Sequence, residues 1–235
     1  MDSPSVDKTR EMFEQWELYY AIIRHNHMLH HDLPPRLNQR FAQLSKSLQV
    51  LDLGSGDGYM AYQSLQGIEV VEYHAVDLSA EALQRLDAET PNWNGHKQMH
   101  VGDFSSVLPT FSAASYDLVF ANYSLHHLST AQKSDLLTEI NRVFKPEGLF
   151  VWTDVVLNED ENREEYLSRL ATVMRAWDGL TPQQQERGIQ HIRDCDFPEK
   201  LSWMTAEMSE LGWSCEAELI RDATFGSWLF RREQS

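Results

Sequence analysis

The sequence is poor in cysteine, in long apolar runs and in basic residues. Its two cysteines, Cys195 and Cys215, are too few for a disulfide framework, so free thiols and a cytoplasmic location are expected. No apolar run reaches the ~18 residues that a membrane-spanning helix needs. The polar N-terminus also lacks the charged and then apolar pattern of a secretion signal. A chain of 235 residues with these properties suits a single α/β domain.

Basic residues are scarce relative to acids. Asp and Glu number 36 against 20 Lys and Arg, which gives a formal net charge of −16. Nucleic-acid affinity depends on basic side chains that neutralise phosphates, so DNA, rRNA and tRNA rank low as partners. A neutral or cationic small molecule is the favoured partner. Part of the acidic excess lies in residues 159–165, a run that is typical of a solvated helix start.

An apolar segment that ends in a glycine-rich turn is the most informative feature that is present. Residues 48–53 predict a buried strand, and residues 59–65 predict a helix. Between them, glycine occupies alternate positions: Gly54, Gly56 and Gly58. Such a turn lets a ligand approach the main chain at the strand end where open α/β sheets bind ligands. The third glycine comes one residue too early for a dinucleotide fingerprint, which argues against a nicotinamide-dependent reductase, and no G-K-[ST] follows, which excludes a P-loop.

The turn resembles motif I of the class I S-adenosylmethionine-dependent methyltransferases, which is D/E-x-G-x-G-x-G after a hydrophobic strand. Asp52 supplies the acid, and the three glycines follow it without a gap. The resemblance implies S-adenosylmethionine as the cofactor and methyl transfer as the activity. The alternation of predicted strands and helices agrees with it. We therefore expect a Rossmann-like α/β fold, with a seven-stranded, mostly parallel sheet, an antiparallel last strand and helices on both faces.

Two later strand ends follow motif I in the expected order. Asp77 ends the apolar segment of residues 70–77, about 20 residues beyond the turn, where an acid accepts hydrogen bonds from ribose hydroxyls. A cap or turn role for Asp77 is the alternative, and Ser79 is the expected N-cap of the next helix. By resemblance, Asp103 receives the adenine amino group and Phe104 packs on the ring. The expected cofactor-binding residues are Asp52, Gly54, Ser55, Gly56, Gly58, Asp77, Leu78, Asp103, Phe104, Asn122 and Tyr123.

The segment after the fourth predicted strand is expected to lie between the cofactor and the acceptor. Residues 116–121 form that strand, and Asn122 opens an N-x-x-x-H-H-x segment that these methyltransferases often carry. His126 and His127 are the candidate catalytic residues, because the pKa of histidine lies near physiological pH. We expect one to act as a general base if the acceptor is a hydroxyl or a protonated amine, and the other to bond a backbone group. A carboxylate, imidazole or thiolate acceptor needs no base.

The predicted elements divide the single domain into four parts. These are an N-terminal helical cap, a cofactor-binding core, a helical insertion, and a C-terminal helix with a strand pair, over residues 1–45, 46–157, 158–197 and 198–235. Cap and insertion each carry an apolar stripe at helical spacing: Met12, Phe13, Trp16, Tyr19, Tyr20 and Ile23 in the cap, and Tyr166, Leu167, Leu170, Val173, Met174 and Trp177 in the insertion. Pro34 and Pro35 are expected to break any helix.

The cap and the insertion are expected to roof an acceptor pocket, with Tyr19, His31, Asp154 and Trp177 as substrate-binding residues. No metal site is expected: His27 and His31 have the i, i+4 spacing of two zinc ligands, but no cysteine lies near them. The favoured function is methylation of a small-molecule acceptor. The alternatives are a non-catalytic S-adenosylmethionine-binding subunit or regulator, and a methyltransferase that acts on tRNA or protein.

Overall fold

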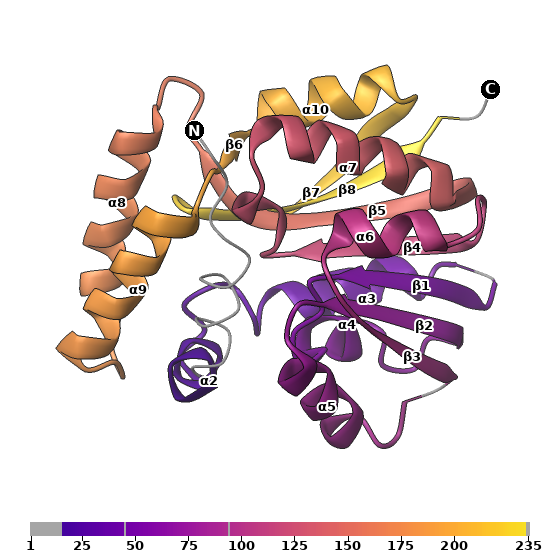
Figure 1. The fold of residues 1–235 in the computed structure, drawn as a ribbon, viewed down its shortest axis with the longest axis horizontal. Coiled ribbons are helices and arrows are strands. Elements are labelled where there is room, and N and C mark those ends of the chain that lie inside the picture. The colour runs from indigo at the N-terminus through magenta and orange to yellow at the C-terminus, as the bar shows by residue number, and fades with distance from the viewer. Residues whose placement is uncertain (1–15, 45, 94, 234–235) are drawn as a thin grey trace.

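The computed structural model of the chain describes residues 16–44, 46–93 and 95–233 (Figure 1). At its centre lies an eight-stranded sheet. Seven strands lie side by side in the order β3-β2-β1-β4-β5-β8-β7, and β6 lies off this row and pairs with β5. The strands are β1 (Leu48–Leu53), β2 (Val70–Asp77), β3 (His96–Val101), β4 (Tyr116–Asn122), β5 (Phe144–Leu157), β6 (Glu199–Lys200), β7 (Trp213–Arg221) and β8 (Phe225–Arg232).

The predicted mostly parallel sheet with an antiparallel last strand is confirmed. The first five strands pair in parallel, and β8 runs antiparallel to both β5 and β7. The short β6 is an additional strand that the sequence does not predict. The chain proceeds outward from β1 to β3 and then returns to the other side of β1 as β4. At such a reversal the carboxyl ends of neighbouring strands border the crevice in which α/β sheets bind ligands.

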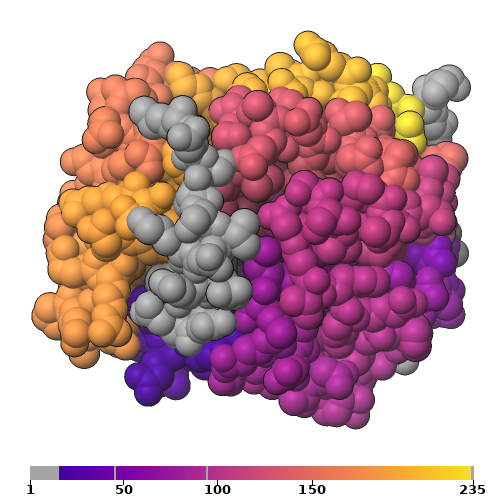
Figure 2. Space-filling model, viewed as in Figure 1, coloured from indigo at the N-terminus to yellow at the C-terminus, as the bar shows by residue number. Residues whose placement is uncertain are grey.

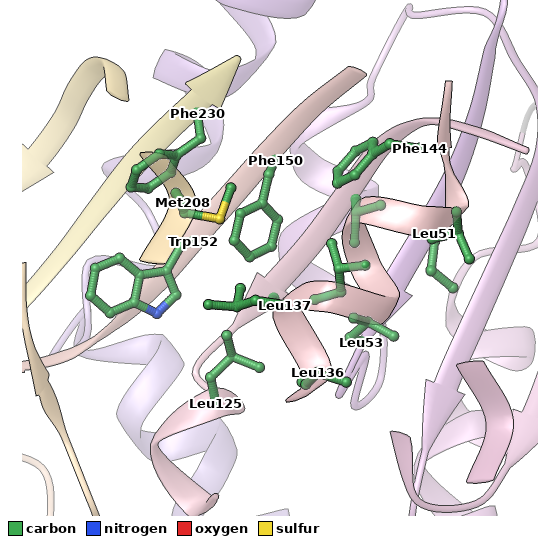
Figure 3. Close-up of a cluster of buried hydrophobic side chains, with 14 of the residues drawn as sticks. Leu51, Leu53, Leu125, Leu136, Leu137, Phe144, Phe150, Trp152, Met208 and Phe230 are labelled. Carbon is green, nitrogen blue, oxygen red and sulfur yellow. The ribbon is translucent and has the colours of Figure 1, made fainter. Parts of the chain in front are cut away.

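Successive side chains of the central strands enter two separate cores, as the alternation of side chains along a strand requires. In β1, Val50 enters one core and Leu51 the other. Figure 3 shows the second core, where Leu137 and Met208 pack against the sheet near Trp152. Around the first core lie α3 (Leu33–Phe41), α4 (Tyr59–Ser64) and α5 (Ala80–Glu89); around the second lie α6 (Phe104–Val107), η1 (Leu108–Thr110), α7 (Thr130–Val143) and α10 (Leu201–Glu210).

The helix α3 corrects one sequence prediction. Pro34 and Pro35 do not simply break a helix, because they occupy the first turn of α3, where the missing N–H of proline has no intrahelical partner to lose. Leu37 and Phe41 are fully buried and hold α3 against the core. The preceding helix α2 (Trp16–Arg24) already ends at Arg24, so the prolines begin a helix and do not end one.

Three helices form a group beside the carboxyl ends of the strands (Figure 1). These three helices, called the cap helices below, are α2, α8 (Arg163–Arg175) and α9 (Pro182–Cys195). Leu18 and Ile22 of α2, Leu170 of α8 and Ile189 of α9 belong to a third apolar cluster, which joins these helices to one another. In Figure 2, α8 and α9 form the orange surface along one side of the molecule.

The apolar stripes of these helices differ in detail from the predicted ones. The buried residues of α2 are Leu18, Ile22 and Ile23. Trp16 and Tyr19 are half-buried, and Met12 and Phe13 lie outside the described residues. Helix α8 ends before Trp177, which is nevertheless buried. Among the described residues, no helix combines the length and the apolar character needed to cross a membrane.

Candidate active site

The glycine-rich turn after β1 packs tightly against two neighbouring segments. Gly54 has a φ of +72°, and a Cβ there would lie 2.4 Å from Cβ of Ser124, in the segment after β4. Gly58 has a φ of +74°, and its Cβ would lie 2.7 Å from Cγ of Leu86 on α5. Only glycine fits both the backbone conformation and the available space. The predicted residue Gly58 thus serves the packing of the turn against α5.

A cavity of about 240 Å³ lies against this turn. Its lining combines residues at the strand ends with residues of the cap helices. Of the predicted site residues, those that line it are Asp52, Gly54, Ser55, Gly56, Asp77, Leu78, Asp103, Phe104, Asn122, Tyr123, His126, His127, Tyr19 and Trp177. Three predicted residues lie outside the lining. Gly58 packs against α5, Asp154 is buried behind His126, and His31 is exposed.

Two buried polar side chains of the lining have atoms without a hydrogen-bond partner in the described part of the chain. Asp52 accepts a hydrogen bond from Tyr73 Oη at 2.6 Å through Oδ2, but its Oδ1 accepts none. Both amide atoms of Asn122 are also buried without a partner. An unpaired buried polar group costs about 1–3 kcal/mol. This end of the cavity therefore suits a ligand that brings both donors and acceptors.

The surroundings of Asp52 favour its protonated form. Burial raises the pKa of Asp52 to about 7; the hydrogen bond from Tyr73 lowers it, and the charges of Asp77 and Asp57 raise it. A positive charge placed beside Asp52 would favour the carboxylate and lower this pKa. The acidic residues at this end of the cavity therefore suit a cationic ligand.

Asp77 connects the first and second strand ends. Its Oδ2 accepts a hydrogen bond from the N–H of Gly56 at 2.8 Å, and its Oδ1 accepts one from the N–H of Ser79 at 2.8 Å. Burial raises the pKa of Asp77, and these N–H groups partly offset that effect. These contacts are those of a cap or turn residue, which is the alternative role predicted for Asp77. Each carboxylate oxygen also has a second lone pair that can accept a hydrogen bond from a ligand. Asp103 is the N-cap of α6 and accepts from the N–H of Ser105 at 2.8 Å.

The 3₁₀ helix η2 (Leu125–His127) follows β4 and carries two buried histidines. Nδ1 of His126 bonds to Oδ1 of Asp154, and the backbone N–H of His126 donates to Oδ2 of Asp154 at 3.1 Å. Nε1 of Trp152 also donates to that oxygen, at 3.2 Å. Nε2 of His126 lies 3.7 Å from Oδ1 of Asp196. Burial lowers the pKa of His126, but the carboxylates of Asp154 and Asp196 outweigh burial and raise it.

The neighbouring His127 has different partners. Its ring centroid lies 4.0 Å from that of His126, and its Nδ1 bonds to the backbone oxygen of Cys195 at 3.2 Å. Burial and the imidazoles of His126 and His191 lower the pKa of His127 well below its ordinary value. The sequence predicts that one histidine of the pair bonds a backbone group, and in the structure His127 makes such a bond. Which of the two assists catalysis stays a prediction.

The remainder of the cavity is mainly apolar. Side chains of the cap helices, of β8 and of the segment after α2 line it, among them Leu18, Ile22, Met28, Leu170, Met174 and Phe225. Within the described residues, no lysine or arginine belongs to the lining. Tyr123 lies against the apolar part, with its ring centroid 6.1 Å from that of Phe225, and it directly follows Asn122 of the acidic part in the chain.

Sequence reasoning missed several polar residues of the lining, among them His30, His191 and Asp196. His30 is buried whereas its neighbour His31 is exposed. The irregular segment between α2 and α3 has no periodicity from which this difference could be predicted. His191 and Asp196 lie on and directly after α9, and their local sequence gives no signal of a contact with the loop after β4.

The fold and this site define a class of protein. A glycine-rich turn after β1, acids at the ends of the first strands and an antiparallel β8 between β5 and β7 are the architecture of a Rossmann-like methyltransferase. Residues 50–148 match the family described as methyltransferase domain. The crystal structure of the YcgJ protein from Bacillus subtilis has the same fold, with a TM-score of 0.59 at 18% identity over 85% of this chain and 99% of that one. Residues 50–148 therefore form a methyltransferase domain of the S-adenosylmethionine-dependent class.

Two curated relatives share more sequence with the chain. A malonyl-[acyl-carrier protein] O-methyltransferase of Halorhodospira halophila is 33% identical over 150 residues, which are 63% of this chain and 48% of that protein. An uncharacterized methyltransferase of Synechocystis is 31% identical over 125 residues, which are 50% of this chain and 55% of that protein. The chain spans about half the length of these relatives.

Proposed function

We propose that the protein transfers a methyl group from S-adenosylmethionine to a small, largely apolar acceptor. One observation carries the proposal: the motif residues, the apolar cap residues and the paired histidines all line the same cavity. A cofactor bound at the acidic end and an acceptor bound at the apolar end would then meet beside η2. The alternative of a non-catalytic binding subunit does not account for the second, apolar part of the cavity.

The residues at the acidic end fit the chemical groups of the cofactor. Asp77 would accept from the ribose hydroxyls, Asp103 would receive the adenine amino group, and Phe104 would pack on the ring. The unpaired atoms of Asp52 and Asn122 supply further polar partners for the amino-acid part. When bound, S-adenosylmethionine supplies a methyl group activated by a positively charged sulfur. The acids of the lining favour that positive charge.

The protein's own contribution to methyl transfer is chiefly positioning. Holding two reactants in a reactive geometry is worth on the order of 7–11 kcal/mol. The cap helices would hold the acceptor and exclude water. Because no lysine or arginine of the described chain lines the cavity, a neutral or cationic acceptor fits better than a carboxylate. The malonyl-[acyl-carrier protein] named for the Halorhodospira relative is therefore the informative comparison substrate.

Two measurements test this function. S-adenosylmethionine and S-adenosylhomocysteine should raise the melting temperature, as any ligand selective for the folded state does. Transfer of a labelled methyl group should then be detected with a panel of apolar alcohols, phenols and amines and not with malonyl-[acyl-carrier protein]. Cofactor binding without transfer to any acceptor would support the non-catalytic alternative. Efficient methylation of the malonyl carrier protein would contradict the proposed acceptor class.

Replacement of His127 by Ala should separate catalysis from cofactor binding. If His127 assists at the acceptor, we expect a loss in kcat of about 10²–10⁴-fold with little change in cofactor affinity. His126→Ala is the second variant, and His25→Ala is a matched control because His25 is exposed on the cap. Steady-state kinetics and calorimetry measure the two quantities. Equal losses of kcat and cofactor affinity in both variants would make the pair structural.

A further inference from the structure

A cluster of three side chains that could bind a metal ion lies in the lining of this cavity. His126 and His127 come from η2, and Asp196 comes from the segment after α9. Each offers one ligand atom, and these atoms lie within 4.8 Å of one another. All three residues are buried, and all three line the cavity. The cluster is therefore both shielded from bulk water and open to a bound molecule.

Each member of the cluster has a further partner that orients it. Asp154 bonds to Nδ1 of His126, and the carbonyl of Cys195 bonds to Nδ1 of His127 at 3.2 Å. Tyr166 Oη donates to Oδ2 of Asp196 at 2.8 Å. Metal-binding histidines in proteins usually donate their other ring N–H to a carboxylate or a backbone carbonyl, and ligating carboxylates are themselves hydrogen-bonded. These bonds assign Nε2 of each histidine and Oδ1 of Asp196 to the ligand positions.

The charges of the cluster also suit a dication. Asp154 and Asp196 are two carboxylates with exposed fractions of 1% and 2%, and buried charges require compensation. Lys133, a buried lysine nearby, forms its ion pair with Glu199 at 2.9 Å. A doubly positive ion between two neutral imidazoles would neutralise both aspartates. Oδ1 of Asp196 has no hydrogen-bond partner in the described part of the chain. This buried oxygen is therefore available to bind the cation.

We propose that His126, His127 and Asp196 bind one divalent transition-metal cation, such as Zn²⁺, with an open position toward the cavity. Catalytic zinc sites hold three protein ligands and leave a fourth position for water or substrate. Bonds of ~2.0–2.1 Å in a tetrahedron place ligand atoms roughly 3.3 Å apart. Nε2 of His126 and Oδ1 of Asp196 are 3.7 Å apart, and the three ligand atoms all lie within 4.8 Å of one another, so ligand atoms would move closer by up to about 1.5 Å when the cation binds.

The role of this cation in catalysis rests on the proposed function, whereas its binding does not. An acceptor hydroxyl at the open position would lose its proton more easily, since a bound dication lowers the pKa of an oxygen ligand. The proton passes to a base in solvent before the cap helices close over the acceptor, and the acceptor oxygen then forms a bond to the methyl carbon. The carbon–sulfur bond breaks at the same time, and its electron pair stays on sulfur. The products are a methyl ether and S-adenosylhomocysteine, with no change of oxidation state at the metal.

Binding can be measured on the intact chain without any acceptor. The protein is treated with EDTA, dialysed, and titrated with Zn²⁺ by calorimetry and with Co²⁺ by visible absorption. The variants Asp196→Asn and Asp154→Asn remove a ligand and an orienting partner. Asp178→Asn is the matched control, because His25, His27 and Asp178 form a second, largely exposed cluster of the same composition on the cap.

We expect one Zn²⁺ per chain, an intense Co²⁺ spectrum typical of a four-coordinate site, and unchanged affinity in Asp178→Asn. Affinity should fall more than about tenfold in Asp196→Asn and about 10–100-fold in Asp154→Asn. A retained thermal shift with S-adenosylmethionine shows that each variant is folded. If Asp196→Asn does not fold, the Co²⁺ spectrum of the wild type still tests the proposal. A weak spectrum typical of octahedral Co²⁺ would contradict the proposed four-coordinate site.

Two other results overturn the proposal. The first is the absence of stoichiometric binding in the wild type, which would leave His126 as an ion pair between Asp154 and Asp196. The second is a loss of binding in Asp178→Asn alone, which would assign the cation to the exposed cluster. Stoichiometric Zn²⁺ binding without S-adenosylmethionine binding would retain the metal site and refute the proposed function.

Discussion

At the scale of single residues, Asp52 makes the cofactor end of the cavity sensitive to pH. Its pKa is about 7 in the folded chain against an ordinary value of 3.8, chiefly because the carboxyl group is buried. At pH values between these two pKa values, the Asp52 carboxyl group is ionised in the unfolded chain and still protonated in the folded chain. The stabilising contribution of protonated Asp52 is therefore complete below about pH 4 and is lost as the pH rises to about 7.

We expect the free energy of unfolding of the ligand-free protein to fall between about pH 4 and pH 7, by up to roughly 1.4 kcal/mol per pH unit from this residue. Denaturant unfolding at a series of pH values measures it. Asp57, Asp77 and Asp196 also have raised pKa values and contribute to the same slope. The informative quantity is therefore the difference in the pH dependence of the free energy of unfolding between the wild type and Asp52→Asn. A slope that is identical in the two proteins would show that Asp52 does not titrate in this range.

Asp77 offers a test of cofactor recognition. Asp77→Ala should weaken the binding of S-adenosylmethionine and S-adenosylhomocysteine by about 1.5–3 kcal/mol, because two ribose hydroxyls would lose a charged acceptor. Glu81→Gln is a suitable control, since Glu81 is an exposed carboxylate in the first turn of α5. Calorimetry gives both affinities. Unchanged affinity in Asp77→Ala would restrict Asp77 to the turn contacts with Gly56 and Ser79.

At the scale of elements, the group formed by α2, α8 and α9 is the part of the fold best suited to move. These helices pack on one another, and on Val155 of β5 and Phe225 of β8, through a third apolar cluster that is distinct from the two cores of the sheet. They also cover the apolar part of the cavity. A segment that admits and encloses a substrate is usually drawn from the less stable parts of a fold.

Hydrogen exchange should reveal this motion. We expect backbone amides of residues 16–35 and 158–197 to exchange faster than those of β1 and β4 in the ligand-free protein. Exchange in these segments should slow when cofactor and acceptor bind together, because closure buries the helices against the ligands. Protection in the cap equal to that of the sheet, without ligands, would contradict a mobile roof.

At the scale of the whole molecule, the net charge of −16 limits the partners. A surface with such an excess of acids repels phosphates. We expect no binding of labelled tRNA or duplex DNA at physiological salt beyond the non-specific range of about 10⁻⁴–10⁻⁶ M. Electrophoretic mobility shifts at several salt concentrations measure this. A salt-dependent shift of tRNA at nanomolar protein would favour the alternative of a nucleic-acid acceptor.

The sequence by itself determined the features that depend on neighbouring residues. The sheet class followed from apolar segments that alternate with helical spacing, and the turn after β1 followed from its glycines. The N-cap role of Ser79 was equally local, and its Oγ accepts from Ala82 N at 3.2 Å. Most predicted cofactor residues line one cavity because parallel strands carry their ends to the same edge of a sheet.

Only the tertiary structure decided the features that depend on distant segments. Asp196 lies opposite His126 because α9 packs beside the loop after β4, and no periodicity encodes that contact. The same holds for His30, whose burial depends on how the segment before α3 folds onto the site, while His31 remains exposed. A strand end or a helix cap is fixed by residues a few positions apart, whereas the acceptor end of this cavity is assembled by the packing of helices far apart in sequence.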